Sequence, residues 1–464
     1  MPPIKANKLS VSLAMVALGL GSSVGAADTL RDVVREALDT NPELAAIRYN
    51  RQAIDQELRA ARGLGLPTVD VKAEAGRHRD SLKNRLGVST TDDWHSHRDV
   101  SLSVSQRLFD GFERDHEVAR QKNRVESARW RVADTANSIA LKAVQAYFEV
   151  QRAEAVLEAA RSNLASLRQL RSRVLRRVNS GLDNAAEETE AGSRVAQATA
   201  ILAEAEGRLQ DARALFKAVV GRMPGKLAPA AVPRAALPPT LSQAVAAARI
   251  AAPSVIATQH DATAAAATIG SAYSRLYPKL NLEVSTYHGK GIDEAGDRDL
   301  DARAMLVVRW NLFNGGINRA RIHEAYARAN EATEISANTE RVVERETRVS
   351  WNAIQSADVR VPSLRRQLQL ARQTRSTYSE QFSVGARRLL DLLDAQSEVF
   401  VADAALRTEE FVRRFNTLRV LAAMGRIVEA LEVAYPEEAV EPHEHWRIES
   451  WKAYVHRTPD DGAK

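Results

Sequence analysis

Three charged side chains late in the chain have the spacing of one helix face. Arg387, Asp391 and Asp394 follow one another at i, i+4 and i+7, directly after Gly385, so a helix would present them on the same side. A guanidinium and carboxylates can form charge-assisted hydrogen bonds that hold and release, and rings of carboxylates around an axis attract cations. We therefore predict a latch or charged constriction here. The alternative is that these acids only favour the start of a helix.

A matching arrangement occurs 204 residues earlier. Gly181 takes the place of Gly385, and Glu187 and Glu190 take the places of the two aspartates. Glycine permits the left-handed backbone that ends many helices, so each glycine predicts a tight reversal between two helices. Acidic residues thus recur at the same places after both reversals.

The whole chain reads as two copies of one plan. Leu-Phe-Asp-Gly at 108–111 matches Leu-Phe-Asn-Gly at 312–315 with the same offset of 204, whereas Thr29 and Thr240 are 211 positions apart. The change of offset predicts a difference in length between the strand-connecting loops of the two copies. One offset held over a long stretch indicates a tandem structural repeat.

The N-terminus has the features of a secretory signal peptide. Lys5 and Lys8 precede an apolar run at 11–20, and small residues ending at Ala26 offer a cleavage site. The run is too short for a membrane-spanning anchor. We expect an exported protein with a signal peptide (1–26), a first repeat (27–226), a proline-rich linker (227–239), a second repeat (240–435) and a C-terminal tail (436–464).

Each copy should contain a helix, two strands joined by a polar loop, a long helix and a shorter helix. Period-two alternation indicates the strands, and long helix-forming runs, interrupted only by Pro362, indicate the long helices. In the first copy we expect a helix at 29–63, strands at 68–76 and 100–105, a loop at 78–98 and helices at 112–179 and 184–220. In the second copy we expect strands at 280–285 and 302–312, a loop at 288–300 and helices at 317–382 and 389–424.

The element lengths predict a rod or tube that reaches a membrane. A helix of about 66 residues spans ~100 Å, and aromatic residues, at 5%, are too few for several globular cores. Strands of about 9–11 residues can cross a bilayer in a tilted barrel, but a barrel needs about eight strands or more. Three chains would supply twelve. A soluble periplasmic coiled-coil scaffold is the alternative of another class.

Several of these segments resemble the TolC family of outer-membrane channel proteins. The resemblance rests on the tandem repeat, the sequences at 108–111 and 312–315, and the stretch from Phe382 to Gln396, and it covers about Asp28 to Val433. The segment at 134–149, DTANSIALKAVQAYFE, is similar to the branch that serves type I protein secretion. The absence of cysteine, and so of a lipidation site, favours the same branch.

The resemblance implies a fold, a location and partners. The fold would be mainly α with a membrane β-barrel portion: four strands per chain in a homotrimeric 12-stranded barrel, continued by a long periplasmic α-helical barrel. The protein would be an exit duct in the outer membrane of a Gram-negative bacterium, extending into the periplasm. Its partners would be outer-membrane lipid, a periplasmic adaptor (membrane fusion protein) and an inner-membrane ABC transporter that drives protein substrate. An outer-membrane component of a drug or metal efflux pump is the alternative within the same fold.

The resemblance also implies a periplasmic gate at the two reversals. The family's gate arginine falls on Arg387, and its acidic partner on the neighbouring hairpin falls on Glu187. The acidic ring of the constriction falls on Asp391 and Asp394. The family's gate tyrosine position carries Phe382 here, which removes one hydroxyl hydrogen bond.

Other chemistry is not indicated. No nucleophile–base set is present, so we expect no enzymatic activity and no cofactor. The pairs His95/His97 and His443/His445 lack a third ligand, so we expect no metal site. The net charge is +6, but arginines alternate with glutamates, which argues against a nucleic-acid partner.

Trp94, Trp310 and Tyr287 are candidates for interfacial aromatic girdles. Six arginines between 161 and 177 could form an adaptor-facing surface or meet nearby carboxylates, but a solvated helix face is the interpretation that we favour.

Overall fold

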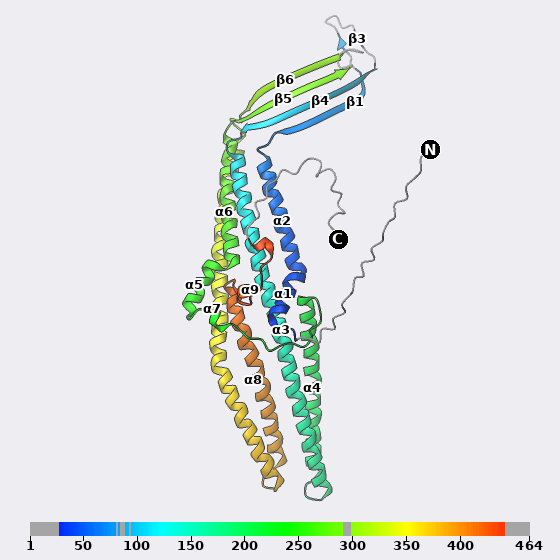
Figure 1. Ribbon diagram of the computed structural model, residues 1–464, viewed down its shortest axis with the longest axis vertical. Coiled ribbons are helices and arrows are strands. Elements are labelled where there is room, and N and C mark those ends of the chain that lie inside the picture. Colours follow the sequence, from blue (N-terminus) through cyan, green and yellow to red (C-terminus); the bar gives the residue numbers. More distant parts are fainter. Residues whose placement is uncertain (1–26, 80–81, 84–88, 92–93, 291–297, 441–464) are drawn as a thin grey trace, which may run out of the picture.

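The chain forms a long rod with a β-sheet at one end and two helical hairpins at the other (Figure 1). This is a computed structural model that describes residues 27–79, 82–83, 89–91, 94–290 and 298–440. The predicted signal peptide and most of the predicted tail, including His443 and His445, lie outside these residues.

Four antiparallel strands make the sheet, in the order β1-β4-β5-β6. A second, two-stranded sheet pairs β2 with β3. The bounds are β1 Thr68–Arg79, β2 Leu82–Lys83, β3 Ser89–Thr91, β4 Trp94–Phe109, β5 Lys279–Lys290 and β6 Arg298–Arg309. The two repeats thus contribute one strand pair each, and β4 joins β5 across the repeat boundary. β1 and β6 are the outer strands of the four-stranded sheet.

The register gives this sheet one apolar and one polar face. One row across the four strands reads Val69, Val104, Val284 and Ala304, and the adjacent row reads Asp70, Ser103, Ser285 and Arg303. The apolar side chains are open to the surroundings in the single chain; Val71, for example, is 70% exposed. Strict alternation with one apolar face is the pattern of a strand that meets lipid on one side.

The strands are longer than the alternation predicted. They contain 12, 16, 12 and 12 residues, and they take in both ends of the predicted loops at 78–98 and 288–300. Backbone pairing continues there, as between Arg77 and Ser96, because polar side chains do not prevent ladder hydrogen bonds when both faces are solvated. Polarity alone therefore made the strands too short on the side of the loops, and it extended the last strand to 312, beyond its end at Arg309.

The helices run along the rod in two matching sets. Each long helix, α3 and α7, has 67 residues, which corresponds to ~100 Å. In Figure 1, α2 and α4 accompany the two halves of α3, and α6 and α8 accompany the two halves of α7. The bounds are α1 Leu30–Thr40, α2 Pro42–Gly63, α3 Glu113–Asn179, α4 Ala185–Val220, α5 Leu241–Ala251, α6 Pro253–Tyr273, α7 Ile317–Ser383, α8 Leu389–Ala423 and α9 Ile427–Ala430.

The predicted first helix at 29–63 is wrong, because it is two helices. Asn41 has an extended backbone (ψ 122°), ends α1, and caps α2 by accepting a hydrogen bond from the Glu43 amide. Pro42 opens α2, and a residue before proline avoids the helical region. The second copy breaks in the same way before Pro253. α7, in contrast, continues as one helix through Pro362.

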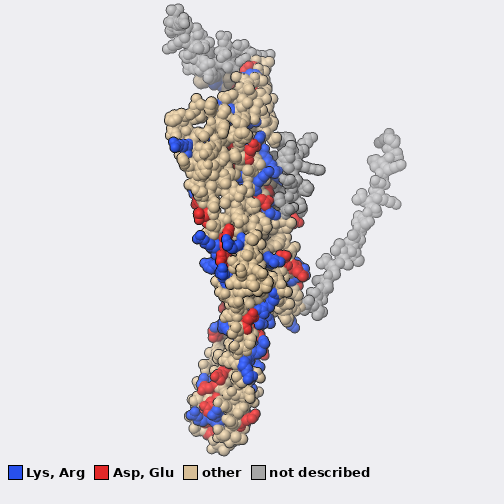
Figure 2. Space-filling model, turned by 90° about the vertical axis from the view of Figure 1, so that its left-hand side faces the viewer, with Lys and Arg blue, Asp and Glu red and all other residues tan. Residues whose placement is uncertain are grey.

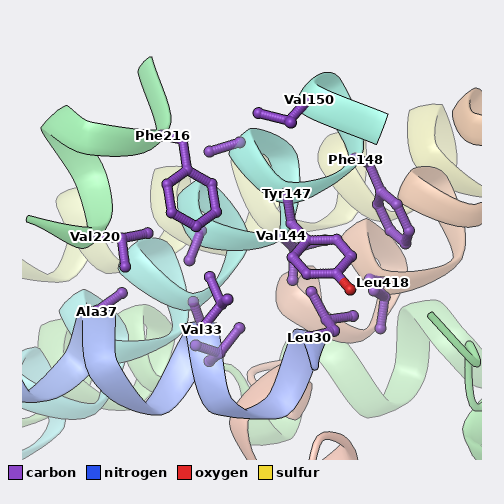
Figure 3. Packing of buried hydrophobic residues seen from close by; sticks show 14 of the residues in the cluster. Leu30, Val33, Ala37, Val144, Tyr147, Phe148, Val150, Phe216, Val220 and Leu418 are labelled. Atoms are coloured by element: carbon purple, nitrogen blue, oxygen red, sulfur yellow. The ribbon is translucent and has the colours of Figure 1, made fainter. Parts of the chain in front are cut away.

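The middle of the rod holds the main apolar core, where α1 packs against α3 and α4 (Figure 3). Tyr147 of α3 is fully buried, and its hydroxyl donates to the carbonyls of Asp28 and Ala228. Burial, with a smaller contribution from the Asp28 charge, raises the pKa of Tyr147 to about 12. The hydroxyl thereby ties the start of the described chain to the linker between the repeats.

The first residues of the predicted tail are packed against the rod. The short 3-10 helix η3 Glu437–Ala439 brings the Glu438 carboxylate to 2.7 Å from Arg48 Nε.

Within the described residues no single helix is long and apolar enough to cross a membrane; only the bent pair Leu241–Ala251 and Pro253–Leu276 meets the length and composition criteria when taken together.

Candidate functional site

The candidate site is the end of the rod farthest from the sheet, where two helical hairpins turn (Figure 1). Gly181 and Gly385 have φ values of 73° and 77°, the left-handed conformation predicted for both reversals. The Leu182 amide donates to the Arg177 carbonyl and the Ala386 amide donates to the Gln381 carbonyl, both at 2.9 Å. These are the bonds of a Schellman motif, so both long helices end in the same way.

An apolar cluster holds the two hairpins together within one chain. Phe382 is 5% exposed and Leu393 is 1% exposed, and both pack with leucines of α3. Burying a leucine or phenylalanine side chain contributes about 1.5–3 kcal/mol. The cluster consists of Leu164, Leu167, Leu170, Val174, Ala191, Ala198, Phe382, Leu389, Leu392 and Leu393.

Polar contacts cross between the hairpins beside this cluster. Arg194 Nη2 of α4 lies 2.8 Å from Asp394 Oδ1 of α8. Gln396 Nε2 of α8 donates to Asn163 Oδ1 of α3 at 2.9 Å, and both side chains are buried. The Arg177 guanidinium lies 5.0 Å from the centre of the Phe382 ring. This geometry is that of a cation–π contact at Phe382.

Arg387 has contacts within its own hairpin. Its guanidinium stacks on the Tyr378 ring at 3.8 Å. Its Nε lies 3.6 Å from Asp391 Oδ2, which is an ion pair but longer than a hydrogen bond. The buried Nε atom has no hydrogen-bond partner in the described part of the chain.

Glu187, the predicted partner of Arg387, does not pair with it within the single chain. Its Oε2 atom is buried and unpartnered among the described residues. The pKa of Glu187 is raised, because burial and the charges of Asp183 and Glu190 outweigh the nearby Arg177. A buried carboxylate oxygen without a donor is costly. Both halves of the predicted pair therefore carry one unsatisfied atom each.

Sequence reasoning missed Tyr378 and Arg194 at this end, and it named Arg177 only as one of six arginines that could meet nearby carboxylates. Arg177 makes two hydrogen bonds to the Asp183 carboxylate, at 2.7 and 3.0 Å, which closes the first hairpin turn. The role of Arg194 had one available indication, since its repeat counterpart is the opposite charge, Glu398. Nothing in the sequence pointed to Tyr378.

The six arginines between 161 and 177 divide into two groups. Arg171 pairs with Glu188 at 2.7 Å, Arg177 with Asp183, and Arg161 with Glu206 at 3.8 Å. The other three have no carboxylate partner among the described residues and line a shallow hollow of about 630 Å³: Arg168, Arg173 and Arg176. Figure 2 shows positive and negative side chains interspersed at the hairpin end.

Near the far end of the sheet, one group of possible metal ligands occurs among the described residues: Glu74, His97 and Asp99. Each already has a protein partner. Lys72 Nζ lies 2.5 Å from Glu74, and His97 Nε2 lies 2.9 Å from Asp99. His95 and His97, the pair noted in the sequence, belong to β4 rather than to a loop.

The architecture is that of an outer-membrane channel protein. The chain belongs to the outer membrane efflux protein family, whose model matches residues 33–222 and 244–425, once in each repeat. It is 24% identical to the outer membrane efflux protein BepC of Brucella suis over 459 residues, covering 98% of both chains. It is 22% identical to the outer membrane protein TolC of Escherichia coli over 440 residues, covering 91% of this chain and 87% of that one.

Solved structures have the same fold. CusC superposes with a TM-score of 0.75 at 19% identity, over 85% of this chain and 91% of that one. The open state of the Neisseria gonorrhoeae MtrE outer membrane channel gives 0.72 at 19%, over 86% and 89%. The predicted tandem repeat and mainly helical fold are thus confirmed, and the predicted outer-membrane location follows from the family. The protein is a transport protein and not an enzyme.

Proposed function

We propose that the protein is a homotrimeric exit duct for type I protein secretion, closed at its hairpin end by a gate. The observation that best supports a duct is the four-stranded sheet, which has an exposed apolar face. Its outer strands, β1 and β6, each pair with one neighbour only within the described part of a single chain. Open edges are not tolerated in lipid, so the sheet must close with other copies. Three copies supply twelve strands, within the range of known barrels.

The aromatic residues favour the same arrangement. Trp94 begins β4 at the far end of the sheet, and Trp310 follows β6 at the end next to the helices. Both are 58% exposed, and the alternation places both on the apolar side. Tryptophans at the two borders of an apolar band are typical of membrane barrels. Tyr287 pairs with Ser101 and Asp301 on the polar face instead, so it is not part of a girdle.

The gate proposal rests on the two unsatisfied atoms at the hairpin end. Arg387 Nε is a buried donor without an acceptor, and Glu187 Oε2 is a buried acceptor without a donor, among the residues described. In a ring of hairpins, the second hairpin of one chain lies next to the first hairpin of its neighbour. An Arg387–Glu187 bond across that boundary would satisfy both atoms. Asp391, Asp394 and Glu190 would then surround the closed entrance.

Protein cargo is supported by the segment Asp134–Glu149 and by the absence of cysteine from the chain. An adaptor and an ABC transporter would be the partners of the duct. Drug or metal efflux is the rival outcome of the experiment below.

Two measurements test the proposal. Purified protein in detergent should have the mass of three chains, and it should form channels in planar bilayers; a monomer without conductance would overturn the duct. A strain without the gene should lose one or more secreted proteins from the medium. Unchanged secretion with new sensitivity to drugs or metal ions would instead assign the duct to an efflux pump.

A further inference from the structure

The ion pair between Arg194 and Asp394 is the shortest charged link between the two hairpins in the described chain. Its 2.8 Å distance is that of a charge-assisted hydrogen bond. Arg194 is 30% exposed and Asp394 is 60% exposed, so the carboxylate remains in contact with solvent while one of its oxygens is bonded. Asp394 is one of the two acids predicted to line the constriction.

The repeat shows that this pair is specific to one boundary. In the opposite repeat of the chain, Glu398 corresponds to Arg194 and Glu190 corresponds to Asp394. In the proposed trimer, the boundary between chains would bring these two positions together in place of the ion pair. Two carboxylates cannot form the link and repel one another. Arg194 therefore acts only within its own chain, once per subunit.

The charges around Asp394 favour a single cationic partner. Asp391, one turn earlier on α8, is approached by Arg387 at 3.6 Å and Arg388 at 3.5 Å. Neither of those arginines is paired with Asp394 among the described residues. From α4, Arg194 is the residue that reaches it. Removing Arg194 would therefore leave Asp394 as an uncompensated negative charge.

We propose that Arg194 is a selectivity-determining residue of the channel entrance, because it neutralises Asp394 and so weakens the preference of the entrance for cations. The inference rests on the proposed gate. Exposed ion pairs contribute little to stability, so the main effect of Arg194 is on the potential that permeating ions meet and not on folding. Three chains carry three such pairs, so the ring of Asp394 carboxylates attracts cations less than its composition indicates.

The test is the reversal potential of single channels in a potassium chloride gradient near 0.1 M, where the screening length is ~10 Å. Arg194→Gln should shift the reversal potential toward the cation limit and raise the permeability ratio of potassium to chloride by roughly twofold or more. The shift should shrink near 1 M, where screening acts within ~3 Å. The double variant Arg194→Gln/Asp394→Asn should return close to the unmodified ratio.

Arg208→Gln is the matched control, because Arg208 pairs with Glu204 on the same helix, α4, away from the hairpin turn. It should leave the ratio unchanged. Circular dichroism and the trimer mass establish that each variant is folded. If the unmodified protein conducts but Arg194→Gln has the same reversal potential, Arg194 does not determine selectivity. If the unmodified protein does not conduct at all, the proposed duct itself fails.

Discussion

The two hairpins occupy the same place in the two repeats, yet they satisfy their charges in different ways. In the first hairpin, Arg177 and Asp183 form a bidentate pair across the turn. In the second, the position of Asp183 holds Arg387, which stacks on Tyr378 and leaves Nε unsatisfied. The first turn is thus closed by its own residues. The second turn retains a donor for a partner outside the hairpin.

The starts of the following helices differ in the same direction. Asn184 caps α4 by accepting a hydrogen bond from the Glu187 amide at 3.1 Å. The corresponding residue of α8, Arg388, is 79% exposed in its side chain and makes no capping bond. The second hairpin therefore has fewer local bonds to hold its shape. This is the hairpin that we expect to move more easily when the entrance opens.

The largest predicted effect concerns the core in the middle of the rod. Phe216 of the first copy is fully buried, and its counterpart is the smaller Val420, also fully buried. Phe216→Ala should cost about 3–5 kcal/mol, because it leaves a cavity against α1 and α3. Val420→Ala removes fewer atoms and should cost less. Thermal unfolding followed by circular dichroism measures both; equal losses would show that the first copy does not carry the greater share of this core.

The second prediction separates the two hairpin arginines. Arg387→Ser should raise single-channel conductance, since losing a charge-assisted hydrogen bond worth about 1.5–3 kcal/mol favours the open entrance. Arg388→Ser removes the same charge one position later, without a ring contact, and should have a smaller effect. Glu187→Ser should act like Arg387→Ser, and the double variant should add little to either. Additive effects would contradict a direct pair.

The third prediction concerns the matched positions Tyr147 and Trp351. Tyr147→Phe removes the hydroxyl bond to the carbonyls of Asp28 and Ala228, which keep their donors from the Ala228 amide and Gln151, so the change should cost about 0.5–1.5 kcal/mol. Trp351 Nε1 is buried without a partner among the described residues, so the second copy has no equivalent bond to lose. Tyr378→Phe is the control, as its hydroxyl makes no hydrogen bond within the described chain. A melting temperature unchanged by Tyr147→Phe would remove the tie between the linker and α3.

The smallest predicted effect tests the two helix starts. Asn184→Ala should destabilise the first hairpin by about 1 kcal/mol, because the Glu187 amide loses its acceptor. Arg388→Ala should cause no comparable loss. Hydrogen exchange of the amides in the first turns of α4 and α8 measures this locally. Faster exchange in both variants to the same degree would contradict the difference between the caps.

The sequence predicted most of the fold, because helices and strands follow from local, periodic patterns of residues. The long helices begin and end within one residue of prediction, since Gly181 and Gly385 stop them by a backbone requirement that a single residue meets. The strand ends were predicted less well, because pairing with a neighbour decides where a strand stops. The break before Pro42 was missed, although a residue before proline disfavours the helical conformation.

The sequence predicted which charged residues lie at the candidate site, but not which of them pair with one another. The sequence by itself determined which charges lie at the hairpin end, because helical spacing and the repeat fix their order along α4 and α8. Only the tertiary structure decided their partners, because Arg194 and Asp394 are 200 residues apart and meet through the packing of two hairpins. Contacts over such separations depend on how whole helices pack, which no local pattern records. For that reason Asp394 is half of an ion pair, and Arg387 and Glu187 each keep an unsatisfied atom.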